Sequence, residues 1–187
     1  MKVSILLLTV FLMFSACDDD PANNNNNDAG TNNNTNNNND EPPDFMIHPA
    51  RVSHITDGDT VYVWYGNQNY KIRIAGIDTP ETYGTPEPFG AEAKQFTIDH
   101  LPTASWVGLE FDNEACATQV PPPSSCFDMY DRLLAYLRTL DNQDLGAQLL
   151  VNGLAEVYTD ADFNRKTQYL QLQNQAISAG VGIWSDK

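Results

Sequence analysis

An asparagine-rich tract near the start of this chain decides how much of it can fold. Residues 23–39 contain the runs Asn23–Asn27, Asn32–Asn34 and Asn36–Asn39 and almost no apolar side chain. Such a segment cannot bury enough apolar surface to offset the conformational entropy that folding would cost. We therefore expect a disordered tether over residues 17–44, with an end-to-end distance of roughly 30 Å. One folded domain is expected over residues 45–187.

A mostly apolar run precedes the tract and predicts export. It extends from Val3 to Ala16 and is too short to span a bilayer as a helix, which needs about 20 residues. We therefore expect a signal peptide over residues 1–16. The small residues before Cys17 resemble the processing box of bacterial lipoproteins, in which the cysteine carries acyl chains. This predicts a lipidated Cys17 and a protein anchored to the cell membrane or outer membrane through lipid alone. A secreted or periplasmic protein with a plain signal peptide is the alternative.

The charge balance limits the mode of ligand binding. The whole chain carries a net charge of −15, and the part after residue 40 still has 9 basic against 20 acidic residues. Most nucleic-acid-binding proteins are basic, because phosphate neutralisation supplies much of their affinity. A nucleic-acid ligand would therefore depend on local arginines or on a metal ion that reverses the field at the site. An acidic surface also suits a salty habitat, where long-range repulsion is screened.

Two further cysteines agree with export. Cys116 and Cys126 form an even pair once Cys17 is assigned to lipid. In an oxidising compartment they predict a disulfide around a short proline-rich segment. Two reduced thiols are the alternative. A zinc site is disfavoured, because no second Cys or His pair lies near them.

The hydrophobic pattern predicts a small barrel. Alternating apolar residues predict strands, and helical spacing predicts helices that follow them. The expected strands are 51–56, 60–65, 70–74, 106–111 and 132–140, and the expected helices are 89–101, 141–151 with Asp141-Asn142 as its cap, and 167–179. This order indicates an α+β, β-rich fold: a five-stranded OB-fold barrel capped by about three helices. Because that fold serves many functions, the function must be argued from a site.

Four short stretches gather carboxylates and guanidinium groups. They are Asp57-Gly58-Asp59-Thr60, Arg73, Ile77-Asp78-Thr79-Pro80-Glu81 and Asp128-Met129-Tyr130-Asp131-Arg132. Carboxylates hold hard cations and orient water, and arginines bind phosphate oxygens through two parallel hydrogen bonds. The combination therefore suits a phosphodiester. Taken singly, each stretch also has a structural explanation, such as a hairpin turn at Gly58 or a salt bridge between Arg73 and Asp78.

In order and rough spacing, these stretches resemble staphylococcal nuclease-like (thermonuclease) domains. Further matching pieces are Gly90, Glu92-Ala93, Leu134-Ala135-Tyr136, Gly153-Leu154-Ala155 and Gly182-Ile183-Trp184. The resemblance covers nearly all of residues 50–186. It implies an OB-fold and a calcium-dependent endonuclease that hydrolyses DNA and RNA and leaves 3′-phosphate ends.

The resemblance also implies a set of site residues. Asp59 and Asp78 match the carboxylate ligands of the calcium ion, and the backbone carbonyl of Thr79 matches the third protein ligand. Asp57 matches a nearby acid outside the ligand set.

The remaining matches concern catalysis. Glu81 corresponds to the residue that acts as general base or positions the attacking water, and Arg73 and Arg132 correspond to the arginines that contact the scissile phosphate. This interpretation predicts a monomeric enzyme acting on single-stranded or denatured DNA, or on RNA.

Two departures from the family pattern concern the loop before Arg132, and the acidic charge of the domain leaves a second function open. Asp131 stands where relatives often have glycine, and Met129 stands where relatives often carry a basic residue. The alternative is a catalytically weak or inactive OB-fold binding module at the cell surface. A carbohydrate-binding module would need exposed aromatic residues in the groove instead of a metal cluster.

Overall fold

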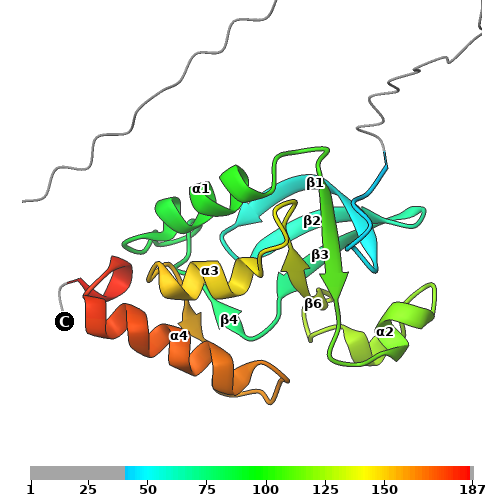
Figure 1. The fold of residues 1–187 in the computed structure, drawn as a ribbon. Coiled ribbons are helices and arrows are strands. Elements are labelled where there is room, and N and C mark those ends of the chain that lie inside the picture. The colour runs from blue at the N-terminus through cyan, green and yellow to red at the C-terminus, as the bar shows by residue number, and fades with distance from the viewer. Residues whose placement is uncertain (1–40, 186–187) are drawn as a thin grey trace, which may run out of the picture. The chain divides into compact units, whose positions relative to one another are not determined.

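The computed structural model describes residues 41–185; the expected signal peptide, Cys17 and most of the expected tether lie outside them. Five strands form a closed barrel in the order β1-β2-β3-β6-β5 (Figure 1). These strands are β1 (Pro49–Asp57), β2 (Thr60–Tyr65), β3 (Gln68–Ile74), β5 (Trp106–Glu110) and β6 (Leu133–Arg138). The five predicted strands are therefore confirmed.

Strand pairing closes the barrel without an exposed edge. β1, β2 and β3 form an antiparallel meander, and β5 runs antiparallel to both β1 and β6. Only β3 and β6 are parallel among these neighbours, with Arg73 level with Leu134. This is the α+β OB-fold arrangement that the sequence predicts.

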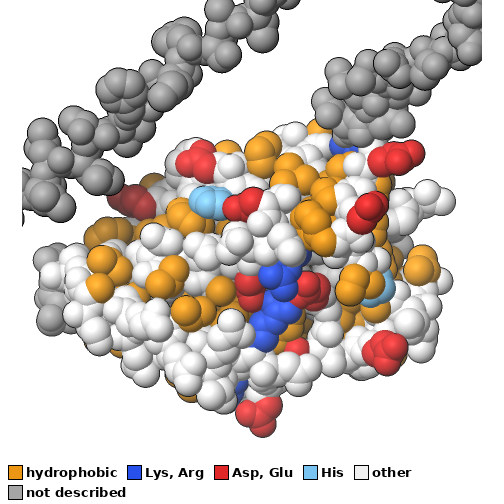
Figure 2. Space-filling model, viewed as in Figure 1, with side chains coloured by type: hydrophobic (Ala, Val, Ile, Leu, Met, Phe, Trp, Pro, Cys, Tyr) orange, Lys and Arg blue, Asp and Glu red, His pale blue; other side chains and the backbone are white. Residues whose placement is uncertain are grey.

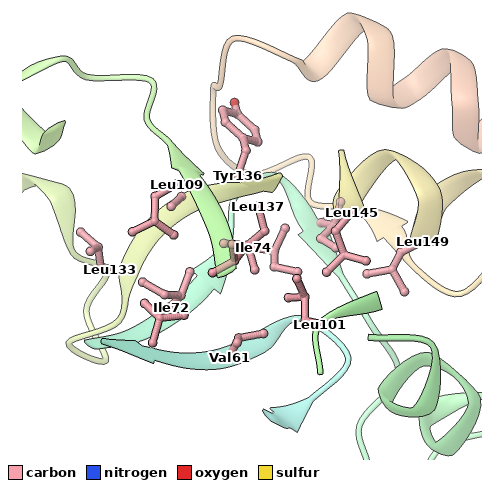
Figure 3. Packing of buried hydrophobic residues seen from close by; sticks show 14 of the residues in the cluster. Val61, Ile72, Ile74, Leu101, Leu109, Leu133, Tyr136, Leu137, Leu145 and Leu149 are labelled. Carbon is pink, nitrogen blue, oxygen red and sulfur yellow. The ribbon is translucent and has the colours of Figure 1, made fainter. Parts of the chain in front are cut away.

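The barrel core is built by side chains that alternate along each strand. Val61 and Val63 on β2 and Ile72 and Ile74 on β3 are fully buried. Residues between them, such as Arg73, face outward, as expected for a period of two. Figure 3 shows Val61, Ile72 and Ile74 inside the barrel, with Leu145 and Leu149 pointing into the same cluster from a covering helix.

Within residues 41–185, three longer helices cover the barrel, and a fourth, α2 (Ala115–Thr118), is a single turn. The longer helices are α1 (Gly90–His100), α3 (Leu145–Val151) and α4 (Lys166–Ala179). α3 packs against α1, α4 and β6 (Figure 1). Further short helical turns are added by η1 (Ser124–Cys126) and η2 (Gly182–Trp184). Among residues 41–185, no helix is long and apolar enough to cross a membrane.

One local prediction was wrong in detail, and the structure adds a second, two-stranded sheet. α3 begins at Leu145 and is capped by Asp144, whose side chain accepts a hydrogen bond from the Ala147 N–H at 3.1 Å. Asn142 adopts a left-handed conformation (φ 61°) in the preceding turn, so the Asp141-Asn142 pair cannot begin the helix. Residues 154–158 contain only a two-residue strand, β7 (Glu156–Val157), which pairs with β4 (Ile77–Asp78) in a separate small sheet.

The segment between β5 and β6 is held by the two cysteines. The structure places the Sγ atoms of Cys116 and Cys126 at 2.05 Å and their Cα atoms 5.7 Å apart, which joins α2 to η1. Both cysteines are buried. The Tyr65 hydroxyl donates to the Ala117 carbonyl at 3.3 Å, so this segment also packs on the barrel.

Candidate active site

The turn between β1 and β2 is held beneath α1. A Cβ atom on Gly58 would lie 2.9 Å from the Cβ of Ala93 and from the side chain of Thr79, so only glycine fits. The Gly58 carbonyl accepts a hydrogen bond from the Thr97 hydroxyl at 2.6 Å. Packing against α1 therefore fixes the turn, and with it the direction of Asp59.

Asp59 links the turn to the segment that follows β4. Its side chain is buried at 2 % exposure. One carboxylate oxygen accepts from the Thr60 hydroxyl at 2.9 Å, and the other accepts from the Thr79 N–H at 2.9 Å. The second oxygen also pairs with the guanidinium of Arg73. A buried carboxylate with three donors has its charge compensated and its orientation fixed.

Arg73 brings two carboxylates together. From the outer face of β3, its Nη1 atom pairs with Asp59 and its Nη2 atom pairs with Asp78. Burial alone would lower the pKa of Arg73, but the two carboxylates more than compensate and raise it. The salt bridge between Arg73 and Asp78 is thus present, but Arg73 also pairs with Asp59.

The oxygen atoms around Arg73 are of the kind that bind hard metal cations. Within residues 41–185, no group of three or more acidic, histidine or cysteine side chains is arranged as metal ligands. Asp59 and Asp78 nevertheless direct oxygens at one positive group, the guanidinium of Arg73. Beside them the Thr79 hydroxyl is buried without a hydrogen-bond partner in the described chain. Arg73 and a metal ion would compete for the same two carboxylates.

Glu81 lies at the start of a closed loop next to this cluster. Its backbone N–H donates to the Glu87 carboxylate at 3.0 Å, and its carbonyl accepts from the Glu87 N–H at 2.9 Å. A Cβ atom on Gly90 would lie 2.7 Å from that carbonyl oxygen, so the start of α1 packs directly on the loop. Partial burial and the negative charges of Asp57 and Asp59 raise the pKa of Glu81. A raised pKa makes this carboxylate a better proton acceptor.

Arg132 is held by Asp128 in the loop before β6. Its Nε and Nη2 atoms both lie 2.7 Å from the Asp128 Oδ2 atom. The other oxygen of Asp128 accepts from the N–H groups of Tyr130 at 2.9 Å and Arg132 at 3.0 Å. Partial burial would raise the pKa of Asp128, but these hydrogen bonds from Arg132 and Tyr130 lower it overall.

Asp131 does not hold Arg132 away from the groove. Its backbone is left-handed (φ 60°), which explains why relatives often have glycine at this position. Aspartate tolerates this conformation better than most residues. The partner of the guanidinium is therefore Asp128, and Asp131 serves the turn.

One groove of about 840 Å³ collects most of the predicted site residues. Arg73, Asp78, Glu81 and Arg132 all line it, together with Lys71, Asp128, Met129, Tyr130, Leu134, Tyr158 and Phe163 among others. Asp59 and Thr79 are buried next to Arg73 and Asp78. The three predicted catalytic residues thus face one cavity, and the three predicted metal ligands lie at one point of its wall.

Sequence reasoning missed several residues of this groove. Lys71 carries a readable signal, because it lies two residues before Arg73 and therefore shares its outward face. Tyr158 and Phe163 carry none, since their positions depend on the β4–β7 pairing. Asp128 was noted in the sequence, but its bond to Arg132 required the structure.

The fold and the groove define an OB-fold domain whose groove gathers arginines and carboxylates. The model of the staphylococcal nuclease homologue family matches residues 71–186, and the chain belongs to this family. The thermonuclease of Staphylococcus hyicus is 33 % identical over 140 residues, covering 73 % of this chain and 75 % of the relative. The thermonuclease of Staphylococcus intermedius is 36 % identical over 141 residues, covering 71 % and 74 %.

Other relatives extend beyond staphylococci. An uncharacterized endonuclease of Haemophilus influenzae is 30 % identical over 138 residues, covering 73 % of this chain and 66 % of the relative. The protein described here is therefore a nuclease, a hydrolase whose substrate is nucleic acid.

Proposed function

We propose that this nuclease is a calcium-dependent endonuclease that hydrolyses denatured or single-stranded DNA, and RNA, at an exported, lipid-anchored location. The observation that carries the catalytic part is that Arg73, Glu81 and Arg132 line one groove. Beside them, Asp59 and Asp78 both pair with the guanidinium of Arg73. A phosphodiester needs this set, because it is anionic and repels a hydroxide nucleophile.

Asp59, Asp78 and the backbone carbonyl of Thr79 would hold the calcium ion. All three donors are oxygens, which Ca²⁺ prefers over nitrogen or sulfur. When bound, the ion would polarise a phosphoryl oxygen and lower the pKa of a water molecule. Asp57 would contribute negative charge nearby, because its charge raises the pKa of Glu81. Its carboxylate accepts from the Thr82 hydroxyl at 3.1 Å.

Glu81 would accept the proton of the attacking water, or orient that water in line with the leaving oxygen. Its raised pKa favours the first role, because a stronger base removes the proton more readily. The loop closed by Glu87 and packed under Gly90 keeps the position of Glu81 constant during the reaction.

Arg73 and Arg132 would bind the non-bridging oxygens of the scissile phosphate. Their hydrogen bonds strengthen as negative charge accumulates on the phosphorus oxygens, so they stabilise the transition state more than the ground state. A cation on Asp59 and Asp78 would release Arg73 toward the substrate. We expect cleavage to leave 3′-phosphate ends.

Hydrolysis of denatured DNA tests these roles. We expect activity with calcium, none with chelator, and losses of about 10²- to 10⁴-fold in Glu81→Gln and Arg132→Ala. Lys94→Ala and Glu114→Gln are controls outside the groove and should retain activity. Mass spectrometry of the products would identify the terminal phosphate. Equal cleavage by the parent protein and both site variants would contradict the assignment.

Export and anchoring are supported by the sequence before residue 41. If Cys17 carries acyl chains, Cys17→Ser should release the protein from the membrane fraction into the medium or periplasm. Metabolic labelling with a fatty acid should mark only the parent protein. Unchanged membrane fractionation of Cys17→Ser would count against lipidation.

A weakly active binding module is a second candidate, because Asp128 neutralises Arg132 and the chain is strongly acidic. This candidate predicts binding of single-stranded DNA without calcium-dependent hydrolysis. The cleavage assay above distinguishes the two functions directly.

A further inference from the structure

Lys71 is a groove residue to which the nuclease chemistry above gives no task. It faces outward from β3 on the same side as Arg73 and lines the same groove. Within residues 41–185, no carboxylate lies within ion-pair distance of its amino group. Its amino group lies over the ring of Tyr62, with Nζ 6.0 Å from the ring centroid.

Several other cations of the described chain are neutralised by carboxylates. Arg138 pairs with Glu110, Arg165 pairs with Glu110 and Asp144, and Lys166 pairs with Asp162. Figure 2 shows such pairing on one face, where a compact blue patch has red atoms on both sides. The chain has a net charge of −15, so few of its positive groups are available to an anion. A groove lysine without a carboxylate partner is such a group.

An aromatic pair continues from Lys71 across the outside of the barrel. Tyr62 is the cross-strand partner of Lys71, and His54 is the cross-strand partner of Tyr62. The rings of His54 and Tyr62 are stacked, with centroids 4.2 Å apart and planes inclined by 15°. Val61 and Ile72, the neighbours of Tyr62 and Lys71 along their strands, are fully buried. Because side chains alternate along a strand, Lys71 and Tyr62 face outward, as does His54 beside Tyr62. We call the stacked pair the His54–Tyr62 platform.

This combination suits single-stranded nucleic acid. Proteins that bind single strands combine cations along the phosphate backbone with aromatic rings on which bases stack. In OB-folds, the face of the second and third strands is a frequent location for this binding. Met129 lines the same groove at 87 % exposure and offers no charge to a phosphate. Lys71 on β3 lines the same groove and carries a positive charge.

We propose that Lys71 binds a backbone phosphate next to the scissile one, and that the His54–Tyr62 platform stacks a base beyond it. The strand would then run from the groove across β3 and β2. The inference rests on the proposed function in one respect: the ligand is a single-stranded nucleic acid.

Equilibrium binding separates the two contacts. The full chain carrying Glu81→Gln, which should bind without cleaving, is titrated in calcium with a fluorescent oligothymidine of about 16 nucleotides. The same titration uses an abasic oligonucleotide of equal length. Lys71→Gln should weaken both ligands several-fold and reduce the slope of log K against log[salt] by about 0.7, the value for one phosphate contact on a single strand. Lys71→Arg should retain the slope.

The platform has a different signature. Tyr62→Leu should weaken oligothymidine roughly 5- to 10-fold and leave the abasic ligand unchanged, because only the former has bases to stack. Lys94→Gln is the matched control, since Lys94 also lies over a tyrosine ring, that of Tyr83, but outside the groove. Thermal melting confirms that each variant is folded.

Three results would overturn the inference. A Lys71→Gln variant that matches Lys94→Gln in affinity and slope would refute the phosphate contact. A Tyr62→Leu variant that binds both ligands equally more weakly would refute the stacking role. A parent protein that binds neither ligand would refute the substrate class, and the proposed function would fall with the inference. Binding by the parent with unchanged variants refutes the inference alone.

Discussion

At the scale of single residues, Asp128 decides how Arg132 is presented to a substrate. Its two oxygens accept three hydrogen bonds, one from the Arg132 Nε–H and two from backbone N–H groups, and Arg132 Nη2 adds an ion-pair contact at 2.7 Å. The contact therefore both neutralises Arg132 and fixes its direction. These two effects have opposite consequences for catalysis, so a substitution separates them.

We expect the fixed direction to matter more. Asp128→Ala should lower kcat/KM roughly 10- to 100-fold, because a misplaced catalytic group loses about this much. The kcat/KM of Asp128→Asn should lie between those of the parent and Asp128→Ala, since its amide oxygen can still accept from the backbone N–H groups. Steady-state kinetics on denatured DNA measure this, with Asp131→Asn as control. A rise in kcat/KM for Asp128→Ala would indicate that Asp128 sequesters Arg132 instead.

Glu110 is the centre of a second network, away from the groove. Its carboxylate pairs with Arg138 and Arg165, and Arg165 also pairs with Asp144 at 2.6 Å. Partial burial would raise the pKa of Glu110, but the hydrogen bonds from Arg138 and Arg165 lower it overall. Because Asp144 also caps α3, this network connects β5, β6, α3 and the start of α4.

The lowered pKa of Glu110 predicts a pH-dependent stability. Its contribution is fully present above the unfolded-state pKa of about 4.3 and is lost as the pH falls through the lower folded-state pKa. Glu110→Gln should therefore destabilise the protein by roughly 1–2 kcal/mol at pH 7, and the difference should shrink below about pH 4. Denaturant unfolding across pH measures this. The exposed residue Glu114 provides the control, and a gap that widens in acid would contradict the prediction.

At the scale of elements, the barrel strands were readable because each has one buried face. Val61 and Val63 alternate with outward residues on β2, as do Ile72 and Ile74 on β3. β4 and β7 were not readable, because two-residue strands carry no period. The start of α3 was misplaced because both Asp141 and Asp144 are acceptable caps, and the turn geometry selects Asp144.

The candidate site shows the same division. The residue types of the site were predictable from their order along the chain. The contact of Arg73 with both Asp59 and Asp78 was not, because it depends on how β3 lies between two turns. Local order along the chain therefore indicates which groups are present, whereas their mutual orientation depends on barrel closure.

The segment between β5 and β6 is the element that contributes cysteines to the groove wall. Cys116 and Cys126 both line the groove, beside Asn113 and Ser125. A disulfide that closes a loop of this size contributes about 2–3 kcal/mol through the unfolded state. The loop leads directly into Asp128 and Arg132, so its order affects the position of the guanidinium.

Removing the disulfide should affect both stability and activity. The double variant Cys116→Ser/Cys126→Ser should lose about 2–3 kcal/mol of unfolding free energy and several-fold in kcat/KM. Thiol counting on the unreduced parent should detect no free thiol at these positions. The parent treated with reductant should behave like the variant, and the variant itself should not respond to reductant. Two titratable thiols in the untreated parent would refute the bond.

At the scale of the whole molecule, net charge opposes substrate capture. The chain carries −15, whereas its substrate is a polyanion. Long-range repulsion slows association and is screened by salt, with a Debye length of about 10 Å at 0.1 M. The short-range contacts of Lys71, Arg73 and Arg132 act in the opposite direction, because salt competes with each phosphate contact.

These two effects predict a maximum in the salt dependence of kcat/KM. At low salt, screening of repulsion should raise kcat/KM up to roughly 0.1 M. At higher salt, kcat/KM should fall with a log–log slope near −2, because three phosphate contacts on a single strand contribute about 0.7 each. Neutralising acids on α1 outside the groove, as in Glu92→Gln/Asp99→Asn, should flatten the rising limb and leave the falling limb unchanged. A steep fall of kcat/KM from the lowest salt concentration onward would contradict this prediction. It would mean that attraction by the groove cations outweighs repulsion by the net charge of the chain.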